Sequence, residues 1–545
     1  MALKYLYVPS GYKSGTAYGV LPNDSSADFD NFVRNTFATR TNKDGLIEVC
    51  ETSGNNLVTN GDFATDSDWS KTHSSITISG GKAHFTDTPN SYGLQQNNFL
   101  TTGKTYEVTF TVSNYVKGAV KVRYPFQTPS VSSDGLYTVT GIAVSSSGGS
   151  DDFRFSCVGE TTLDIDDVSV REVLSNVPKI DYSDGGCPSL LLERMRTNEC
   201  RASESINSWN KNPSSSAVTI RENDEISPDG NMNADVVSVL TEFDGVLTPS
   251  MVTVSNTTYS CSAYVKHVSG SPKIRFGISS NFHSGTGSKY VRFDLSDGSL
   301  IFDTLAGVGE FKSVYVGNGW YRLMIENILV PVNAGGDSSF IVYSYEDAFT
   351  EFAVWGGQIE VGDYTSSYIP NLNTSVGSQT TRNNDRAGWA ANFDGMNSNE
   401  GVLEARFKAV PTTVSRRITL GTNVNGDNHN RITIGYTING GIVKPLVLIA
   451  YDGGGTELSE NQSVNMPSSF NIFDYNTYKF KFKAGNNELK INGELVSLND
   501  TIGNLDFSFG DALVSISLNL FGGSTSNVFY GGIQHIKVYD SVTDF

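Results

Sequence analysis

Carboxylates and histidines build most hydrolytic and metal-dependent active sites, and in this chain they are scattered. A glycoside hydrolase places two carboxylates about 5 to 9.5 Å apart across a cleft, whereas Glu404 and Glu488 each stand alone on a predicted strand. No G-x-S-x-G elbow or phosphate-binding loop is present. The histidines show no metal-ligand spacing: His73, His84, His267, His283, His429 and His535. We therefore nominate no catalytic residue and predict that the protein is not an enzyme.

Aromatic side chains offer a different chemistry, because a sugar ring can stack on an exposed aromatic face while amides and carboxylates bond its hydroxyls. The candidates for such glycan binding are Trp69, Tyr92 and Tyr124. Tyr124 ends a predicted strand before Pro125 and is the better exposed candidate, whereas burial in a sandwich core is the favoured interpretation for Trp69. A core position is predicted more strongly for three other tryptophans: Trp209, Trp320 and Trp355.

The composition limits the partners of this 545-residue chain. It has 39 Lys and Arg against 58 Asp and Glu, which gives a formal net charge of -19. This balance argues against nucleic acid, because phosphate binding depends on clustered cations. No apolar run approaches the roughly 20 residues that span a bilayer, and no secretory signal is legible. The five scattered cysteines contain no C-x-x-C pair, so we expect a reducing compartment and no disulfide framework.

The candidate residues must be positioned by strands, because apolar and polar residues alternate with a period of two wherever a pattern is visible. Residues 106–112 are a clear case, with Tyr, Val, Phe and Val on one face and Glu, Thr and Thr on the other. No stretch of three or more helical turns carries an apolar stripe at helical spacing. An all-β protein of tandem antiparallel β-sandwiches is predicted.

An internal repeat defines two of these sandwiches. Residues 105–124 have a counterpart in residues 258–276, at an offset of 153 residues at the start of the match and 152 near its end. We interpret the repeated segment as a hairpin of nearly constant length. A Gly-x-Tyr strand follows each copy, at 135–137 and at 319–321. Two related sandwiches are the simplest explanation.

The first sandwich carries recognisable opening and closing segments. Residues 56–63 read Asn-Leu-Val-Thr-Asn-Gly-Asp-Phe and precede Trp69, and residues 163–170 read Leu-Asp-Ile-Asp-Asp-Val-Ser-Val. In these features residues 51–174 resemble the jelly-roll carbohydrate-binding modules appended to xylanases and laminarinases. The resemblance implies a jelly roll in which the N-G-D-F and D-D-V segments lie side by side.

The same resemblance implies a structural calcium ion between those two segments. It nominates Asp62, Asp166 and Asp167, whose carboxylates are hard oxygen ligands of the kind that Ca²⁺ accepts. Ala64 stands where many relatives have a polar ligand. Acidic residues at solvated strand ends are therefore the favoured interpretation of Asp62, Asp166 and Asp167, and calcium is the one cofactor that the sequence raises.

A second resemblance concerns the segments between the sandwiches. They are Thr-Arg-Thr-Asn-Lys-Asp-Gly-Leu-Ile-Glu at 39–48, Asn-Val-Pro-Lys-Ile-Asp-Tyr at 176–182, Cys-Pro-Ser-Leu-Leu-Leu-Glu at 187–193 and Arg-Thr-Asn at 196–198. They resemble a module recurrent in tailed-bacteriophage structural proteins, in which the G-L-I-E and N-V-P-x-I-D-Y segments are close neighbours. The resemblance implies that the first sandwich is an insertion between them.

The second jelly-roll sandwich is predicted at 204–370, after a connector at 175–203. It fits the same bacteriophage pattern through three segments in one order: Gly-Asn-Gly-Trp-Tyr-Arg at 317–322, Gly-Gly-Gln-Ile-Glu at 356–360 and Tyr-Thr-Ser-Ser-Tyr-Ile-Pro at 364–370. Several independent motifs in one order make this the more diagnostic of the two resemblances.

The last unit is predicted at 388–545, after an Asn-, Thr-, Ser- and Gly-rich linker at 371–387. Residues 478–483 alternate cleanly, and Asn492-Gly493 supplies the residues that a tight hairpin turn favours. With a final strand at 533–539, this unit resembles the laminin-G-like or concanavalin-like sandwiches found at the ends of phage fibres. That fold serves lectins, glucanases and inert spacers alike, so it does not decide the role.

Together the resemblances imply a structural appendage of a bacteriophage virion, a tail fibre or head fibre, made in the host cytoplasm. Residues 1–50 hold too little apolar material for a core of their own, and we predict that they attach the protein to other virion proteins. The sandwiches would adhere to host-surface or environmental glycans, and multivalent display would add avidity. A fibre implies a homotrimer. The alternatives are a non-adhesive capsid decoration and a polysaccharide-degrading tail spike.

Overall fold

The computed structural model describes most of the chain, and every structural statement below concerns the described residues. The description omits residues 1, 31, 98–99, 103, 125–129, 144–151, 175, 214–216, 284, 333–335, 373–378, 392–395, 397–398, 410–415, 423–429, 440, 452–455, 461–464, 510–512, 519–528 and 543–544. Within the rest, regular structure is β apart from four short helical turns: η1 (Ser25–Ala27), η2 (Ile206–Ser208), η3 (Ser280–Phe282) and α1 (Asp500–Gly503). The predicted all-β class of antiparallel sandwiches is confirmed. No helix in this part of the chain has the length and hydropathy that a membrane-spanning segment needs.

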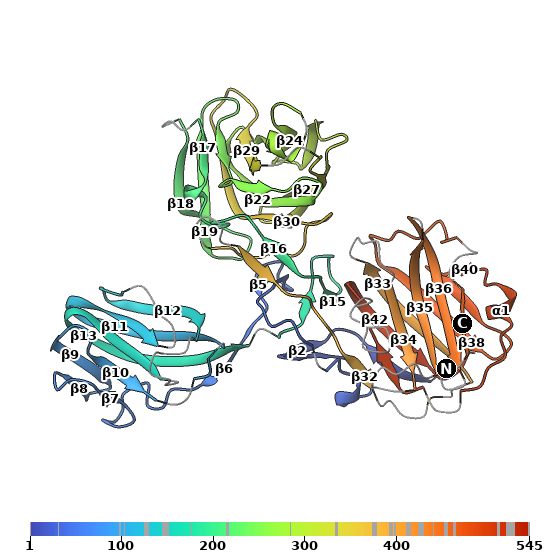
Figure 1. Cartoon of the computed structure of the whole chain (residues 1–545), viewed down its shortest axis with the longest axis horizontal. Helices are drawn as coiled ribbons and strands as arrows, with labels where there is room; N and C mark the ends of the chain where they lie inside the picture. The colour runs from blue at the N-terminus through green and yellow to red at the C-terminus, as the bar shows by residue number, and fades with distance from the viewer. Residues whose placement is uncertain are drawn as a thin grey trace. The chain divides into compact units, whose positions relative to one another are not determined.

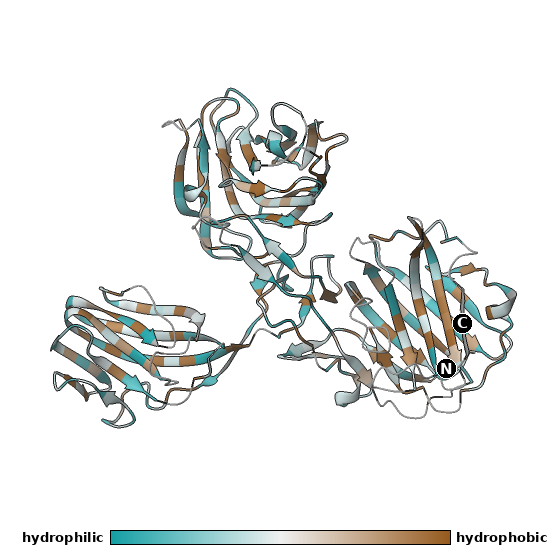
Figure 2. Cartoon of the chain, viewed as in Figure 1, coloured by the Kyte–Doolittle hydropathy of each residue, from teal (hydrophilic) through white to brown (hydrophobic). Residues whose placement is uncertain are grey.

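Residues 51–175 form one compact unit, and the chain on either side of them belongs to the other compact unit. Within residues 51–175 the strands are β6 (Thr52–Asn56), β7 (Ser70–Lys71), β8 (Ile76–Ser79), β9 (Lys82–Thr88), β10 (Gly93–Gln96), β11 (Thr105–Tyr124), β12 (Gly135–Ile142) and β13 (Phe153–Leu174). Their order is β12-β11-β13-β10-β7, and β6 and β9 also pair with β13. Alternate side chains of β11 face the core, among them Val108, Phe110 and Val112 (Figure 2). The period of two in the sequence is therefore the pleat of this strand.

The predicted hairpin at 105–124 is wrong, because β11 runs through the whole segment as one long strand. Asn114 and Gly118 adopt left-handed backbone conformations, with φ of 52° and 75°, and the pairing register shifts around them. The strand bends there instead of reversing. Its first part pairs with β12 and with the end of β13, and its last part pairs with the beginning of β13.

The second sandwich, in the other compact unit, has two sheets around one core. One sheet has the order β17 (Asn210–Asn212), β20 (Gly245–Leu247), β29 (Phe340–Ser344), β23 (Lys273–Ile278), β24 (Lys289–Asp294), β25 (Ser299–Asp303). The other has the order β18 (Thr219–Ile226), β19 (Met232–Val239), β30 (Thr350–Val361), β22 (Thr258–Gly270), β27 (Trp320–Leu329), β26 (Glu310–Gly317). A small sheet pairs β21 (Met251–Thr253) with β28 (Gly336–Ser338).

Strand pairing follows the sequence repeat. Strand β22 lies between β27 and β30, as the first part of β11 lies between β12 and the end of β13. Strands β22 and β23 belong to different sheets, so the hairpin prediction is wrong for this copy too. Gly270, with φ of 74°, is the last residue of β22. Ser271 and Pro272 connect it to β23, which begins at Lys273 in the other sheet. The repeated segment is thus one bent strand in the first sandwich and two consecutive strands of different sheets in the second.

The C-terminal sandwich draws strands from three distant parts of the chain. Its first sheet contains β14 (Lys179–Asp181), β15 (Ser189–Leu192), β42 (Gly531–Tyr539), β33 (Glu400–Ala409), β38 (Asn476–Lys483), β39 (Glu488–Ile491) and β40 (Glu494–Val496), with β1 (Leu3–Tyr7) also paired to β42. Its second sheet contains β32 (Trp389–Ala391), β41 (Ser515–Ser517), β34 (Arg416–Gly421), β35 (Arg431–Asn439), β36 (Ile442–Tyr451) and β37 (Thr456–Glu460). Asn492 and Gly493 have φ of 51° and 85°, so the predicted tight hairpin is confirmed.

The N-terminal segment contributes to the core of this C-terminal sandwich. Strand β1 pairs antiparallel with β42, and Tyr5, Tyr7 and Phe29 are completely buried in the same hydrophobic cluster as the C-terminal strands. Short sheets join the remaining segments: β2 (Gly11–Lys13) with β3 (Thr16–Tyr18), β4 (Thr39–Thr41) with β5 (Ile47–Val49), and β16 (Arg196–Asn198) with β31 (Thr380–Arg382). The sequence alone did not indicate this placement.

All five cysteines are free, as the sequence predicts. Cys157 and Cys261 are buried in the cores of the first and second sandwiches, where they act as small apolar side chains. Burial raises the pKa of Cys157 to about 11. The thiol is therefore protonated at neutral pH and unreactive.

We predict that the buried ring of Tyr7 stabilises the C-terminal sandwich. Tyr7→Ala should lower the free energy of unfolding by about 3 to 5 kcal/mol, because it deletes a fully buried ring. Tyr7→Phe should change it by no more than about 1 kcal/mol, because the buried hydroxyl has no hydrogen-bond partner. Denaturant unfolding measures both, with Val20→Ala at an exposed position as the control. An unfolding midpoint of Tyr7→Ala equal to that of the parent would contradict the placement of β1.

Candidate functional site

Trp69 lies in the core of the first sandwich. Its side chain is 7 % exposed, and its ring packs against Phe63 and Phe153 at centroid distances of 5.2 and 6.1 Å. The indole N–H donates a hydrogen bond to the carbonyl of Asn60 over 2.9 Å. Of the two interpretations that the sequence left open for Trp69, the structure thus favours the core, because its faces are covered by other rings.

Tyr92 presents an aromatic face at the surface of the same sandwich. It is 42 % exposed, and its ring lies beside that of His73 at a centroid distance of 4.7 Å. Backbone hydrogen bonds in both directions between residues 91–92 and Cys157 hold the loop, and Arg154 donates to the carbonyl of Ser91 over 2.8 Å. A rigid exposed phenol ring of this kind suits stacking on a sugar. Tyr124 ends β11, and its side chain lies outside the described part of the chain.

The structure brings together the two segments that were predicted to hold calcium, but it does not build a carboxylate site from them. The amide of Val168 donates to the carbonyl of Gly61 over 2.9 Å, so the opening and closing segments are neighbours. Asp166 accepts the amide of Asp167 over 2.7 Å. Burial raises the pKa of Asp166, and the nearby charges of Asp167 and Asp62 add to this.

A bound divalent cation needs several converging ligands. Among the described residues, no three His, Cys, Asp or Glu side chains are grouped closely enough to hold a metal ion. As placed, Asp62, Asp166 and Asp167 therefore do not fit an all-carboxylate calcium site. Calcium stays a prediction from the resemblance alone.

Six charged side chains meet in the interior where the N-terminal segment, the connector and the two sandwiches of the larger compact unit join. We call this cluster the charged joint. None of its side chains is more than 4 % exposed. The members are Arg34, Lys179, Glu193, Glu360, Arg382 and Asp385.

Asp385 sits at the centre of the charged joint. Its carboxylate lies 3.1 Å from Arg34 Nη1 and 2.7 Å from Lys179 Nζ, and it accepts the amide of Glu193 over 2.9 Å. These contacts reach the N-terminal segment through Arg34 and the connector through Lys179 and Glu193. The charged joint as a whole contains three cations and three carboxylates, so its net charge is zero in a region from which water is excluded.

Glu193 carries the clearest electrostatic signature of the joint. Burial alone would raise the pKa of its carboxyl, but Arg382 and Lys179 outweigh burial and hold the pKa well below its ordinary value. Arg382 Nη1 lies 2.9 Å from Glu193, and Ser367 donates both its amide and its hydroxyl to the same carboxylate. Glu193 is therefore ionised at all physiological pH values and serves to lock these segments together.

The segments that resemble the bacteriophage module surround the charged joint. The amide of Thr41 donates to the carboxylate of Asp181 over 2.8 Å. The side-chain amide Nδ2 of Asn198 donates to the backbone carbonyls of Gly357 and Ile369 over 3.0 and 2.7 Å. Motifs that lie far apart in the sequence are thus hydrogen-bonded neighbours. One signal of this was present in the sequence, because Glu193 directly follows three leucines and a charge buried beside them needs a partner.

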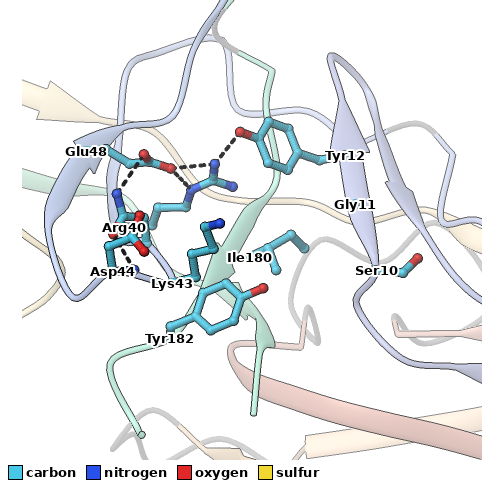
Figure 3. A pocket seen from close by; sticks show the side chains of 10 residues that line it. Ser10, Gly11, Tyr12, Arg40, Lys43, Asp44, Glu48, Ile180 and Tyr182 are labelled. Carbon is cyan, nitrogen blue, oxygen red and sulfur yellow. Dashed lines mark hydrogen bonds and ion pairs between the residues drawn. The ribbon is translucent and has the colours of Figure 1, made fainter. Parts of the chain in front are cut away.

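A pocket of about 290 Å³ opens beside the joint, between β2, the β4–β5 hairpin and β14 (Figure 3). The Arg40 guanidinium lies over the ring of Tyr12 at 4.0 Å and is held by Glu48, whose carboxylate is 2.7 Å from Nε. Figure 3 shows the Lys43 side chain below the Arg40 guanidinium, with the Tyr182 ring beyond it. Arg40 is 7 % exposed, and its Nη1 has no hydrogen-bond partner. Two phenol rings and several polar groups thus line one cavity.

The isolated carboxylates of the sequence have structural partners. Burial would raise the pKa of Glu404, but hydrogen bonds from His535 and Lys537 lower it to about 2. A carboxyl with that pKa is a poor proton donor near neutral pH. Glu488 pairs with Lys481. The sequence favours solvated strand faces for both glutamates, and the structure instead shows Glu404 partly buried and ion-paired, while Glu488 is paired at the surface.

Comparison with known proteins adds no assignment. No model of a known protein family and no curated protein matches the chain. Among solved structures, the tandem carbohydrate-binding modules CBM22-1-CBM22-2 of Paenibacillus barcinonensis Xyn10C cover 57 % of this chain and 99 % of their own, at 12 % identity and a TM-score of 0.24. Domains LG4-5 of the mouse laminin α1 chain cover 62 % and 92 %, at 9 % identity and a TM-score of 0.18. Trypanosoma rangeli sialidase in complex with sialic acid covers 94 % and 95 %, at 9 % identity and a TM-score of 0.20. Scores this low carry no functional conclusion, and none of the three is a bacteriophage protein.

We predict that the charged joint is a major source of stability in the larger unit. Asp385→Asn keeps the shape of the side chain but removes the carboxylate charge beside the buried Arg34 and one of the two carboxylates that pair with Lys179, so it should lower the free energy of unfolding by about 3 to 5 kcal/mol. Denaturant unfolding measures the loss. Lys273→Ala breaks the exposed pair with Glu346 and is the control, with an expected change much smaller than that of Asp385→Asn. Equal effects of the two substitutions would contradict a special role for the joint.

Proposed function

We propose that this chain is a non-enzymatic structural appendage protein of a tailed-bacteriophage virion, which displays β-sandwiches for adhesion to glycans. The observation that carries the proposal is the charged joint. Three of its six members, Lys179, Glu193 and Glu360, lie in segments that resemble the bacteriophage module, and Asp181 of the same segments bonds to Thr41 nearby. Their role in this chain is therefore to hold sandwiches together, as a display scaffold requires.

The proposed adhesion rests on two surfaces. The exposed ring of Tyr92, held beside His73, offers a stacking face on the first sandwich. The pocket at Arg40 offers the phenol rings of Tyr12 and Tyr182 beside cationic and acidic groups. Both combine aromatic faces with hydrogen-bonding groups, which is the combination that sugar recognition needs. Several copies, as in a homotrimer, would raise weak contacts to useful avidity.

Attachment to other virion proteins is proposed for the part of residues 1–50 that follows β1. Strand β1 itself is occupied by its pairing with β42. Beyond it, Val20 and Phe37 are 43 % and 37 % exposed. Exposed apolar side chains in a segment of short strands suit a contact with another protein.

The virion proposal predicts that an antibody raised against residues 388–545 labels intact phage particles. Electron microscopy of labelled particles then separates the versions of the proposal. Label on the tail supports a tail fibre, label on head projections supports a head fibre, and an even coat of label on the head supports a capsid decoration. Absence of label from every particle, with label on the purified protein as the positive control, would reject the virion assignment.

The adhesion proposal predicts that Tyr92→Ala weakens binding to the glycans of the host surface several-fold, since an aromatic contact contributes on the order of 1 kcal/mol. Glycan arrays and adsorption to cells measure the change. Leu136→Ala removes another exposed apolar side chain of the same sandwich, which is 72 % exposed, and should leave binding unchanged. Undiminished adsorption by Tyr92→Ala would favour the non-adhesive decoration, and release of reducing sugar from host polysaccharide would favour the tail spike.

A further inference from the structure

Strand β24 of the second sandwich carries a ring and a guanidinium on the face of its sheet that points away from the core. Val291 and Phe293 are completely buried in the core of this sandwich. Because successive side chains of a strand point to opposite faces, Tyr290 and Arg292 lie on the outer face. This outer face belongs to the sheet that contains β20, β29, β23, β24 and β25.

Neighbouring strands extend this pair into a row. In the pairing register, Arg275 of β23 lies opposite Arg292 on one side, and Phe302 of β25 lies opposite it on the other. Tyr345 directly follows β29, and Phe243 lies just before β20. We call the row of six side chains the arginine ladder. Its members are Phe243, Arg275, Tyr290, Arg292, Phe302 and Tyr345.

Guanidinium groups and rings alternate along the arginine ladder. The guanidinium carbon of Arg275 is 3.8 Å from the ring centroid of Phe243 and 5.1 Å from that of Tyr345. The guanidinium carbon of Arg292 is 4.6 Å from the ring centroid of Tyr345 and 4.9 Å from that of Phe302. Cations over ring faces attract the rings at these distances. The ladder is therefore held in place before any ligand arrives.

Solvent reaches the arginine ladder. Phe243 and Phe302 are 45 % and 48 % exposed. Tyr290, Arg292 and Tyr345 are half-buried, and the guanidinium of Arg292 lies close to the protein surface. Large exposed apolar side chains that gather in one place mark interaction sites, whereas single ones do not. A molecule in solution can thus touch both a ring face and a cation here.

The two arginines of the ladder differ in their electrostatic partners. Arg275 is completely buried and forms an ion pair with Glu242. Arg292 Nη1 donates to the Tyr345 hydroxyl over 3.2 Å, and among the described residues no carboxylate forms a salt bridge with Arg292. Asp294, the acidic residue of β24, accepts hydrogen bonds from the turn that follows the strand. Arg292 is thus a surface cation held by rings and not by a counter-charge.

We propose that the arginine ladder binds an acidic glycan, with a sugar carboxylate on Arg292 and the carbon face of a sugar ring on Phe302. The planar fork of N–H donors on a guanidinium matches the two oxygens of a carboxylate. An exposed ring beside a charged donor is the combination that recognition of such a sugar needs. A neutral glycan would leave Arg292 without a counter-charge.

The acidic balance of the whole chain makes such binding selective. At physiological ionic strength, exposed charges act over about 8 Å, so the groups of the ladder and not the net charge of -19 decide the contact. The same net charge disfavours non-specific attachment of polyanions elsewhere on the protein. Binding of an acidic glycan therefore reports on a built site.

This inference goes beyond the proposed adhesion at Tyr92 and the Arg40 pocket, since it names a different surface and the charge of the sugar. It does not require a virion, because the ladder lies within one sandwich of the chain. Its test uses the purified chain and soluble oligosaccharides. Failure of that test is therefore distinguishable from failure of particle labelling or of cell adsorption.

The experiment is calorimetric titration of the purified full chain with three acidic probes: tetragalacturonate, hyaluronan oligosaccharides and oligosialic acid. The carboxyl-reduced form of each probe is its matched neutral control. We expect saturable binding of at least one acidic probe, which added salt weakens. The carboxyl-reduced form should bind about tenfold more weakly, because it lacks the charge-assisted hydrogen bonds.

Matched variants locate the binding on the ladder. Arg292→Gln should weaken binding of the active probe about tenfold. Lys211→Gln removes a cation from β17, at the opposite edge of the same sheet, and should leave the affinity unchanged. Phe302→Ala, at an exposed position, tests the stacking face without changing a charge and should weaken binding several-fold. Leu329→Ala, 52 % exposed on the other sheet, is its control.

The outcomes separate an acidic-glycan site from other uses of this surface. No binding of any acidic probe, or equal binding of the carboxyl-reduced forms, would overturn the proposal. Equal weakening by Arg292→Gln and Lys211→Gln would also overturn it. Self-association of the chain that Phe302→Ala abolishes, without glycan binding, would assign the surface to a contact between copies instead. Unchanged affinity of a folded Phe302→Ala variant would reject the stacking face.

Discussion

The burial of six charges in one joint is the constraint on which the larger unit depends. Removing a charged group from water costs several kcal/mol, and only close opposite charges with further hydrogen bonds offset this. In the charged joint, Asp385 and Glu193 meet that condition by contacting cations from the N-terminal segment, the connector and the segment after the second sandwich. None of these segments can leave without stranding a buried charge. The motifs that resemble a bacteriophage module are thus explained by the partners that these charges require.

The aromatic side chains of this chain have different environments, because each strand has one face toward its own sandwich core and one face away from it. Trp69 and Trp209 are buried inside their sandwiches and bond backbone carbonyls. Trp355 lies on the outer face of its sheet, where the β4–β5 hairpin covers it and leaves its indole N–H unpaired. Tyr92 remains open to solvent. The exposure of each aromatic side chain therefore depends on which faces other segments cover.

Local patterns predicted local structure well. The alternation at 478–483 and the Asn492-Gly493 turn became the β38–β39–β40 meander, because pleat and turn conformation are properties of neighbouring residues. The repeat at 105–124 and 258–276 correctly indicated two related sandwiches. Its interpretation as a hairpin failed, since the register shift near Asn114 and Gly118 bends the strand, and only its partner strands determine where it pairs.

The sequence by itself determined that the chain is all-β, acidic, free of a disulfide framework and repeated in two sandwiches, because period, charge and composition can be counted along the chain. The tertiary structure alone decided that β1 pairs with β42 and that Arg34 meets Asp385. These contacts join residues hundreds of positions apart. A buried charge or an unpaired indole has meaning only once its surroundings are known, because solvation and hydrogen bonding are properties of a place in the fold and not of a residue type.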